Sequence, residues 1–134
     1  MIKYLLDTNV CIYVIRKRPV RVLARLRRKR LSEVGISTIT LSELEYGVAK
    51  SLRPEANKLA LIEFLAPIEV LPYDDMAAER YGRIRAFLER QGRPIGSMGM
   101  LIAAHALSLD CILVTNNEAE FRRVPGLKIE NWIG

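Results

Sequence analysis

Five short apolar runs alternate with longer segments of helical periodicity, and this alternation constrains the fold more than any other feature of the sequence. Short runs bounded by turn-forming residues are typical of buried strands. The predicted strands are residues 3–6, 33–37, 68–71, 111–115 and, more weakly, 127–131. Because helical segments separate the strands, the connections are expected to be right-handed crossovers within one parallel sheet. The sequence therefore predicts an α/β fold with helices on both faces of the sheet, a three-layer α/β/α sandwich.

Capping residues and prolines set the expected limits of the helices. Thr40 and Glu43 match a capping box, in which two side chains satisfy free backbone amides reciprocally. Ser97 is expected to cap an alanine-rich, buried helix, and Asn117 with Glu120 to form a further capping pair. The helical segments expected are 10–15, 19–31, 40–50, 54–66, 74–91 and 97–107.

Length and hydropathy bound the class of protein. The 134 residues, half of them hydrophobic, suit one domain spanning 1–134 with a substantial core. No apolar run is long enough to span a bilayer and no signal-peptide pattern is present, so we expect a cytoplasmic protein without a membrane partner. Cys11 and Cys111 lie far apart in apolar surroundings, which indicates reduced core residues and not a metal site.

The chain carries 21 basic against 15 acidic residues, a net charge of +6 that favours a polyanionic partner. Residues 16–30 hold a dense run of Arg and Lys with no acid, interrupted by apolar residues at roughly helical spacing. This pattern predicts an amphipathic helix with a very basic outer face. Such a face is either simply solvated or binds phosphates or an acidic protein, and the unrelieved repulsion within it favours binding. The candidates for nucleic-acid contact are Arg16, Lys17, Arg18, Arg25 and Arg28.

Asp7 comes directly after the first predicted strand and is followed by Thr8 and Asn9. In open α/β sheets, ligands bind outside the carboxyl ends of the strands, where Asp7 is expected to lie. Asp7 is also well placed to cap the helix that follows, because aspartate is a favoured N-cap residue. Whether Asp7 is only a structural cap or also a functional group depends on which other residues are expected beside it.

Polar side chains from distant segments are expected to meet at this same edge of the sheet, because each helix that follows a strand begins there. These side chains are Asp7, Glu43, Asn116, Asn117 and Glu120. Like-charged carboxylates repel one another, so such a cluster needs a cation. Oxygen ligands without nearby Cys or His suit Mg²⁺ or Mn²⁺. A metal of this kind can generate hydroxide from water and stabilise displacement at phosphorus, while the basic face holds a nucleic acid.

Several separated motifs, in order, carry a resemblance to a known family. They are residues 5–9 (Leu-Leu-Asp-Thr-Asn), 39–47 (Ile-Thr-Leu-Ser-Glu-Leu-Glu-Tyr-Gly), 95–98 leading into 101–106, 114–117 with 120–121, and the closing 124–127. From end to end the chain resembles the PIN-domain ribonucleases and, more narrowly, the VapC-type toxins of type II toxin–antitoxin systems. The resemblance implies a PIN-domain sandwich with strand order 3-2-1-4-5.

The resemblance also implies a function. It is that of a Mg²⁺-dependent endoribonuclease, with Mn²⁺ able to substitute, acting as the toxin of a bacterial toxin–antitoxin pair. The implied substrate is RNA, with tRNA favoured and initiator tRNA the best candidate. The implied partners are a cognate VapB-type antitoxin, a second copy in a homodimer, and a toxin–antitoxin hetero-oligomer that meets operator DNA only through the antitoxin.

Matched to this sequence, the family's motifs assign Asp7 and Glu43 as metal-binding and catalytic acids. The family varies in its fourth acidic region. There the resemblance implies Asn116 as a metal ligand, and Asn117 and Glu120 as catalytic residues.

The third acidic position departs from the family pattern. That pattern is a glycine, two residues and then an aspartate, so counting from Gly96 the aspartate belongs at 99, where the chain has Gly99. An acid is favoured in the first turn of a helix, whereas glycine there costs roughly 1 kcal/mol relative to alanine. We therefore expect the catalytic and metal-binding group to be lost at Gly99, with weaker metal binding, strongly reduced cleavage and an intact fold. The loss is either natural or engineered.

His105, the only histidine, is expected to pack within the alanine-rich helix or at its rim, because no acid or nucleophile is near it in sequence to form a relay. Two other functions stay open. One is a non-catalytic PIN-fold module that binds RNA or antitoxin. The other is a receiver-like phosphoacceptor, which the third strand disfavours because it ends at Pro72 and Tyr73 without an acceptor aspartate.

Overall fold

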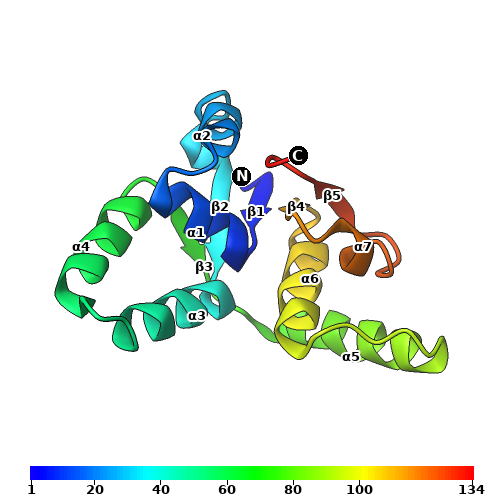
Figure 1. The fold of residues 1–134 in the computed structure, drawn as a ribbon. Coiled ribbons are helices and arrows are strands. Elements are labelled where there is room, and N and C mark those ends of the chain that lie inside the picture. Colours follow the sequence, from blue (N-terminus) through cyan, green and yellow to red (C-terminus); the bar gives the residue numbers. More distant parts are fainter.

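A computed structural model describes residues 1–134 and contains one five-stranded sheet (Figure 1). The strands are β1 (Tyr4–Leu6), β2 (Val34–Ser37), β3 (Glu69–Leu71), β4 (Ile112–Val114) and β5 (Lys128–Glu130). All pairings are parallel and the order is β3-β2-β1-β4-β5, which confirms the predicted topology. β1 is therefore central, with β2 and β4 on either side of it.

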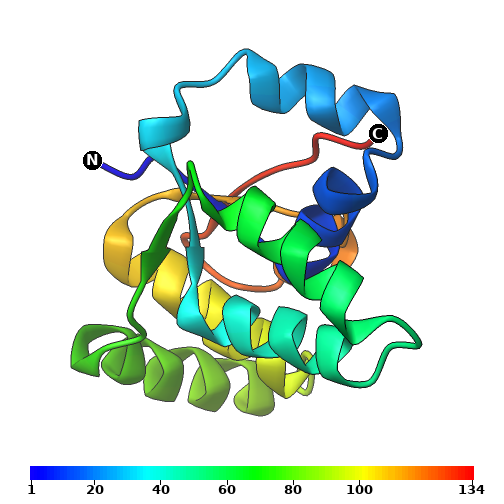
Figure 2. The same cartoon turned by 90° about the vertical axis from the view of Figure 1, so that its left-hand side faces the viewer.

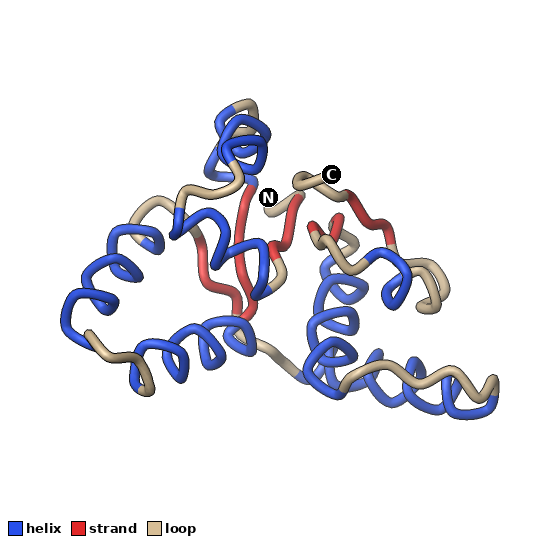
Figure 3. The backbone as a smooth tube through the Cα atoms, viewed as in Figure 1, coloured by secondary structure: helices blue, strands red, loops and turns tan.

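Helices cover both faces of the sheet, as Figures 1 and 3 show. The helices are α1 (Thr8–Arg16), α2 (Val20–Arg27), α3 (Thr38–Ala49), α4 (Pro54–Leu65), α5 (Asp75–Arg90), α6 (Ser97–Leu109) and α7 (Glu118–Phe121), with a short 3-10 helix, η1 (Leu31–Glu33), before β2. One apolar core joins α1, α2 and α4 to the sheet, and a second joins α5, α6 and α7 to its other face. The predicted three-layer α/β/α sandwich is confirmed.

The side chains of β1 show why the central strands are apolar throughout. Tyr4 and Leu6 point into the core beside α1, while Leu5 points into the core beside α6, and all three are buried. A strand covered on both faces needs a continuous apolar run and not an alternating one. The free thiols of Cys11 and Cys111 are buried, one in each core, which confirms that they are packing residues.

The start of α3 differs from the prediction. Ser37 is its N-cap and accepts a hydrogen bond from the backbone N–H of Ile39 at 3.0 Å. Thr40 is buried within the helix, so the predicted capping box of Thr40 and Glu43 is wrong. The physical reason is that β2 passes directly into α3 without a loop, so the last residue of the strand takes the capping position.

Other helix limits shift by a few residues. α1 begins at Thr8, two residues earlier than predicted, because Asp7 caps it. Gly96 and not Ser97 occupies the N-cap position of α6 and offers no side chain, so that prediction is wrong as well. α2 ends at Arg27, and Leu31 belongs to η1, because the basic segment turns away before β2.

The basic helix α2 lies across the end of the molecule that holds the amino ends of the strands, as Figures 1 and 2 show. Lys29, just after α2, donates a hydrogen bond to the hydroxyl of Tyr4 at 3.2 Å. Its ammonium also lies over the rings of Tyr4 and Trp132, which pack edge to face at a centroid distance of 5.5 Å. None of the helices is both long and apolar enough to cross a membrane.

Candidate active site

A hollow of about 200 Å³ lies at the carboxyl edge of the sheet. The helices α1, α3 and α6, which contribute to its lining, are labelled in Figure 1. The lining comes from the start of α1, from α3, from the first turns of α6 and from the α7 segment. The lining residues are Asp7, Thr8, Asn9, Glu43, Met98, Gly99, Ile102, Asn117, Glu120 and Phe121. Of the polar side chains predicted to meet at this edge, all except Asn116 line the hollow.

Asp7 is both a cap and a member of the hollow. Its carboxylate accepts a hydrogen bond from the backbone N–H of Val10 at 2.9 Å, and only 6% of the residue is exposed. Burial raises the pKa of Asp7 above its ordinary value, and the nearby charge of Glu43 raises it further. Hydrogen bonds from Thr115 and Val10 act in the opposite direction. Asp7 is therefore confirmed as the cap of α1, and its carboxylate also lies at the hollow.

Glu43 is held toward the hollow by the opposite helix. The Thr8 hydroxyl, at the start of α1, donates a hydrogen bond to Oε1 of Glu43 at 2.5 Å. The same hydroxyl lies 3.5 Å from that of Thr40. Thr8 thereby connects α1 to α3 and fixes the side chain of Glu43, which explains why a threonine after Asp7 matters for the geometry of the site.

Gly99 is the third residue of α6 and has no backbone reason to be glycine. The glycines with positive φ are Gly92 and Gly126, and Gly99 is not among them. A Cβ on Gly99 would lie 3.4 Å from the ring of Phe121 and 3.7 Å from Oε1 of Glu120, which are ordinary contact distances. The hollow therefore has room for a side chain at this position, and that side chain would begin beside Glu120.

Glu120 caps the amino end of α6. Its Oε1 accepts a hydrogen bond from the backbone N–H of Gly96 at 2.8 Å, and its Oε2 accepts one from the side-chain amide of Asn117 at 2.6 Å. The predicted capping pair is wrong in detail, because Asn117 makes no capping bond to α7. Instead, Glu120 supplies the carboxylate that the amino end of α6 lacks.

Asn116 lies outside the hollow. Its amide nitrogen is 3.4 Å from the hydroxyl of Tyr13, and its buried amide oxygen has no hydrogen-bond partner. Of the two amide candidates that follow β4, the structure therefore brings Asn117 to the hollow and directs Asn116 toward α1. Thr115 supports the turn between them, because its hydroxyl accepts a hydrogen bond from the backbone N–H of Asn117.

The five predicted nucleic-acid contacts are not at the hollow. Arg16, Lys17 and Arg18 lie at the far end of α1, and Arg25 forms an ion pair with Glu130 at 3.7 Å. Arg28 follows directly on α2, at the opposite edge of the sheet (Figure 1). Arg16 lines a groove that also contains Glu43, whereas the other four lie away from the carboxylates of the hollow.

Sequence reasoning missed three apolar residues of the lining, Met98, Ile102 and Phe121. Met98 and Ile102 are one helical turn apart on either side of Gly99, and this spacing is the signal that could have found them. The expectation that His105 packs is confirmed. It is buried, its Nδ1 lies 2.8 Å from Oγ of Ser37, and burial lowers its pKa.

Asp7 and Glu43 are the residues that fit a metal ion. Two coupled oxygen donors, one of them with a raised pKa, suit a hard divalent cation that would neutralise them. The chain has no group of three or more His, Cys, Asp or Glu side chains arranged to hold a metal. Gly99 lies in the same lining as Asp7 and Glu43 and contributes no side chain to it.

Comparison with known proteins assigns the chain to a family. The PIN domain family model matches residues 4–127. The chain is 50% identical to the tRNA(fMet)-specific endonuclease VapC of Shigella flexneri, covering 98% of this chain and 99% of that one. It is 44% identical to Ribonuclease VapC2 of Haemophilus influenzae, covering 99% and 100%.

Solved structures give the same result. DNA-bound VapBC from Salmonella typhimurium contains a chain 46% identical to this one, with a TM-score of 0.93 and coverage of 98% and 99%. VapBC2 from Rickettsia felis, bound to a promoter DNA fragment, matches at 41% identity, a TM-score of 0.90 and the same coverage. The chain therefore belongs to the PIN domain family and, within it, to the VapC ribonucleases of VapBC toxin–antitoxin systems.

Proposed function

We propose that the hollow is a Mg²⁺-dependent endoribonuclease centre, with Mn²⁺ able to substitute, and that it acts on tRNA, initiator tRNA in particular. The observation that carries the proposal is the pairing of buried Asp7 with Glu43 in one hollow at the carboxyl edge of the sheet. A relative at 50% identity is named as a tRNA(fMet)-specific endonuclease, which supports the choice of substrate.

Asp7 and Glu43 would hold the ion, which when bound supplies an activated water and neutralises charge at the phosphorus. The chain's own residues preorganise these two acids. The Val10 N–H and the Thr115 side chain fix Asp7, and the Thr8 hydroxyl fixes Glu43. Met98 and Phe121 form part of the apolar lining of the hollow.

We propose further that this chain is catalytically impaired. A third carboxylate is lacking at Gly99, and the nearest acid, Glu120, is engaged by Gly96 and Asn117. With fewer protein ligands, the site should bind the metal more weakly and orient it less well. The room for a Cβ at Gly99 means that the defect is local and leaves the fold intact.

We propose a VapB-type antitoxin as the protein partner, with a homodimer and a toxin–antitoxin hetero-oligomer that meets operator DNA through the antitoxin. A groove of about 250 Å³ between α1, α3 and α4 supports this, because its lining combines apolar residues with the charges of Glu43 and Arg16. An antitoxin segment in this groove would lie beside the active site. RNA and operator DNA belong to the cytoplasm, where we place the protein.

A second candidate function is a non-catalytic module of the same fold that binds RNA or antitoxin. The specific observation in its favour is that no three acids of this chain are arranged to hold a metal. In this case the hollow would contribute surface and no chemistry.

A cleavage assay separates the two. This chain, Gly99→Asp, the isosteric neutral control Gly99→Asn, and Gly99→Asp combined with Asp7→Asn would each be incubated with total tRNA and with Mg²⁺, Mn²⁺ or EDTA. We expect strong cleavage only by Gly99→Asp, abolished by EDTA. Equal metal-dependent cleavage by this chain would contradict the impairment, and no cleavage by any protein would favour the binding module.

A further inference from the structure

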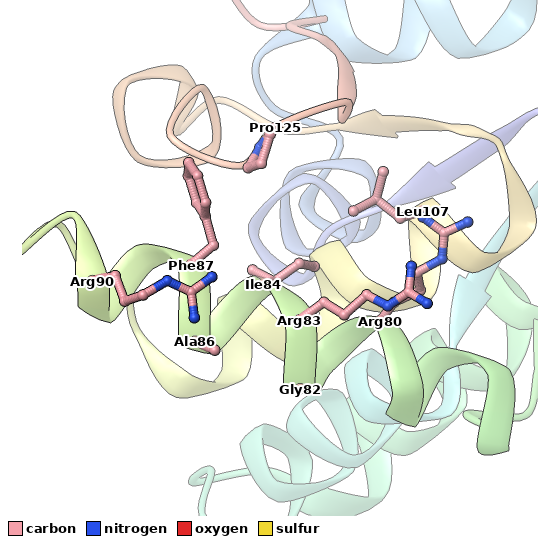
Figure 4. A pocket seen from close by; sticks show the side chains of 9 residues that line it. All are labelled: Arg80, Gly82, Arg83, Ile84, Ala86, Phe87, Arg90, Leu107 and Pro125. Atoms are coloured by element: carbon pink, nitrogen blue, oxygen red, sulfur yellow. The ribbon is translucent and has the colours of Figure 1, made fainter.

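Six arginines line two neighbouring surface hollows that share Phe87 and contain no carboxylate in their lining. The larger hollow, about 600 Å³, runs along α5 (Figure 4). The smaller, about 190 Å³, lies between the end of α5 and the end of α7. We call this surface the arginine face, and its arginines are Arg80, Arg83, Arg90, Arg93, Arg122 and Arg123.

The arginine face keeps a positive excess after its ion pairs are counted. Arg83 pairs with Glu79 at 3.1 Å and Arg122 with Glu118 at 2.8 Å, and both arginines are largely exposed, so these pairs are weak. The other four arginines form no ion pair within the chain. Such a surface favours an anionic partner.

The floor of the larger hollow is apolar and includes an aromatic ring. Figure 4 shows Phe87 reaching from α5 toward Pro125, with the guanidinium of Arg90 on one side of it and those of Arg83 and Arg80 on the other. Guanidinium groups bind phosphates bidentately and stack on bases, and aromatic rings stack on unpaired bases. Arginines around an aromatic floor therefore match single-stranded or looped RNA better than an acidic peptide, because binding of an acidic peptide needs only positive charge and no aromatic surface.

The smaller hollow of the arginine face adjoins the active site along the chain. Arg122 and Arg123 directly follow Glu120 and Phe121, which line the catalytic hollow. Arg123 also donates a hydrogen bond from Nη1 to the backbone carbonyl of Pro94 at 3.0 Å, in the segment that leads to α6. An RNA strand leaving the catalytic hollow on this side would meet the arginines next.

We propose that the arginine face binds the sugar–phosphate backbone of the RNA substrate outside the bond that is cut, a proposal that rests on RNA being the substrate. Phosphate contacts of this kind supply affinity and register but no chemistry. The basic helix α2 lies at the opposite edge of the sheet from the catalytic hollow.

The test measures binding without cleavage. Fluorescence anisotropy with a 3′-fluorescein-labelled initiator tRNA transcript in EDTA would compare this chain with two double variants. Arg80→Ala with Arg90→Ala removes two charges from the arginine face. Arg21→Ala with Arg27→Ala removes two charges from α2 and is the matched control, because all four arginines are exposed, helical and free of ion pairs.

We expect the first double variant to bind roughly tenfold more weakly and to lower the slope of log K against log salt by about two, whereas the control changes binding by about twofold or less. Equal losses in both variants, or a larger loss in the control, would overturn the proposal while leaving the ribonuclease assignment intact. Unchanged RNA binding together with loss of a homodimer in light scattering would assign the face to a second copy and also overturn it. No tRNA binding by any variant would overturn this proposal, and the cleavage assay of the Gly99→Asp variant then decides the proposed function separately.

Discussion

Replacing Gly99 by aspartate should restore a metal site, and the structure allows the size of the effect to be worked out. The new Cβ would lie 3.4 Å from the ring of Phe121 and 3.7 Å from Oε1 of Glu120, so it needs no backbone movement. The added carboxylate would join Asp7 and Glu43 in one hollow. Without metal, its repulsion by these acids is opposed by the favourable position of an acid in the first turn of α6, so the unfolding free energy should change little.

With metal bound, the attraction between the added carboxylate and the cation exceeds the hydration energy that the carboxylate loses. A carboxylate about 4 Å from a divalent cation gains ~8 kcal/mol at an effective dielectric constant of 20. The lost hydration of the carboxylate, several kcal/mol, offsets about three quarters of this gain, which leaves about 2 kcal/mol, or roughly 30-fold in the metal dissociation constant. Saturating Mg²⁺ should therefore raise the melting temperature of the Gly99→Asp variant and leave that of this chain nearly unchanged.

Isothermal titration with Mn²⁺ at low ionic strength would measure the dissociation constants of this chain, of Gly99→Asp and of Gly99→Asn. The asparagine variant has the same shape but no charge, so it isolates the electrostatic contribution. Equal affinities for the aspartate and asparagine variants would refute the reasoning, because charge at position 99 would then not determine metal binding.

Three further predictions concern stability, measured by urea unfolding. Asp7→Asn should raise the free energy of unfolding of the metal-free chain at neutral pH, because the raised pKa of Asp7 means that its charged form is unfavourable in the folded state. This gain should shrink as the pH falls through the raised pKa toward the ordinary value of 3.8. A gain that does not depend on pH would contradict the prediction. Glu120→Ala should cost about 1 kcal/mol, because the Gly96 N–H loses its acceptor, and an unchanged midpoint would count against the cap. Gly35→Ala should lower the free energy of unfolding by about 2 kcal/mol, because the new Cβ would lie 2.9 Å from a backbone carbonyl of β3. In the matched control, Gly47→Ala, the new Cβ meets nothing within 4 Å, and the free energy of unfolding should rise by about 0.5–1 kcal/mol. Similar effects of the two substitutions would be inconsistent with this packing.

The sheet and the placement of Asp7 could be predicted from the sequence because both follow from short-range patterns. Apolar runs separated by helical segments determine a parallel sheet, and the residue after a strand must lie at the carboxyl edge. The cap of α3 could not be predicted with certainty, because Ser37 and Thr40 are both good caps and the choice depends on whether a loop separates β2 from α3.

The interactions of Glu120 and the arginine face could not be predicted, because both join segments far apart in the chain. Glu120 caps α6 across 24 positions of sequence, which no local pattern encodes. The arginine face collects residues from α5, from the segment after it and from the end of α7, so no single run of charge marks it. The run that does stand out, in residues 16–30, lies mainly at the opposite edge of the sheet.

Anomalous diffraction from Mn²⁺-soaked crystals of the Gly99→Asp variant tests most directly whether the hollow is the catalytic metal centre. We predict one strong peak within the hollow, bound by Asp7 and the introduced carboxylate, with Glu43 facing the same ion. A hollow without Mn²⁺ at concentrations that support cleavage, or an ion bound away from Asp7, would contradict the proposed centre.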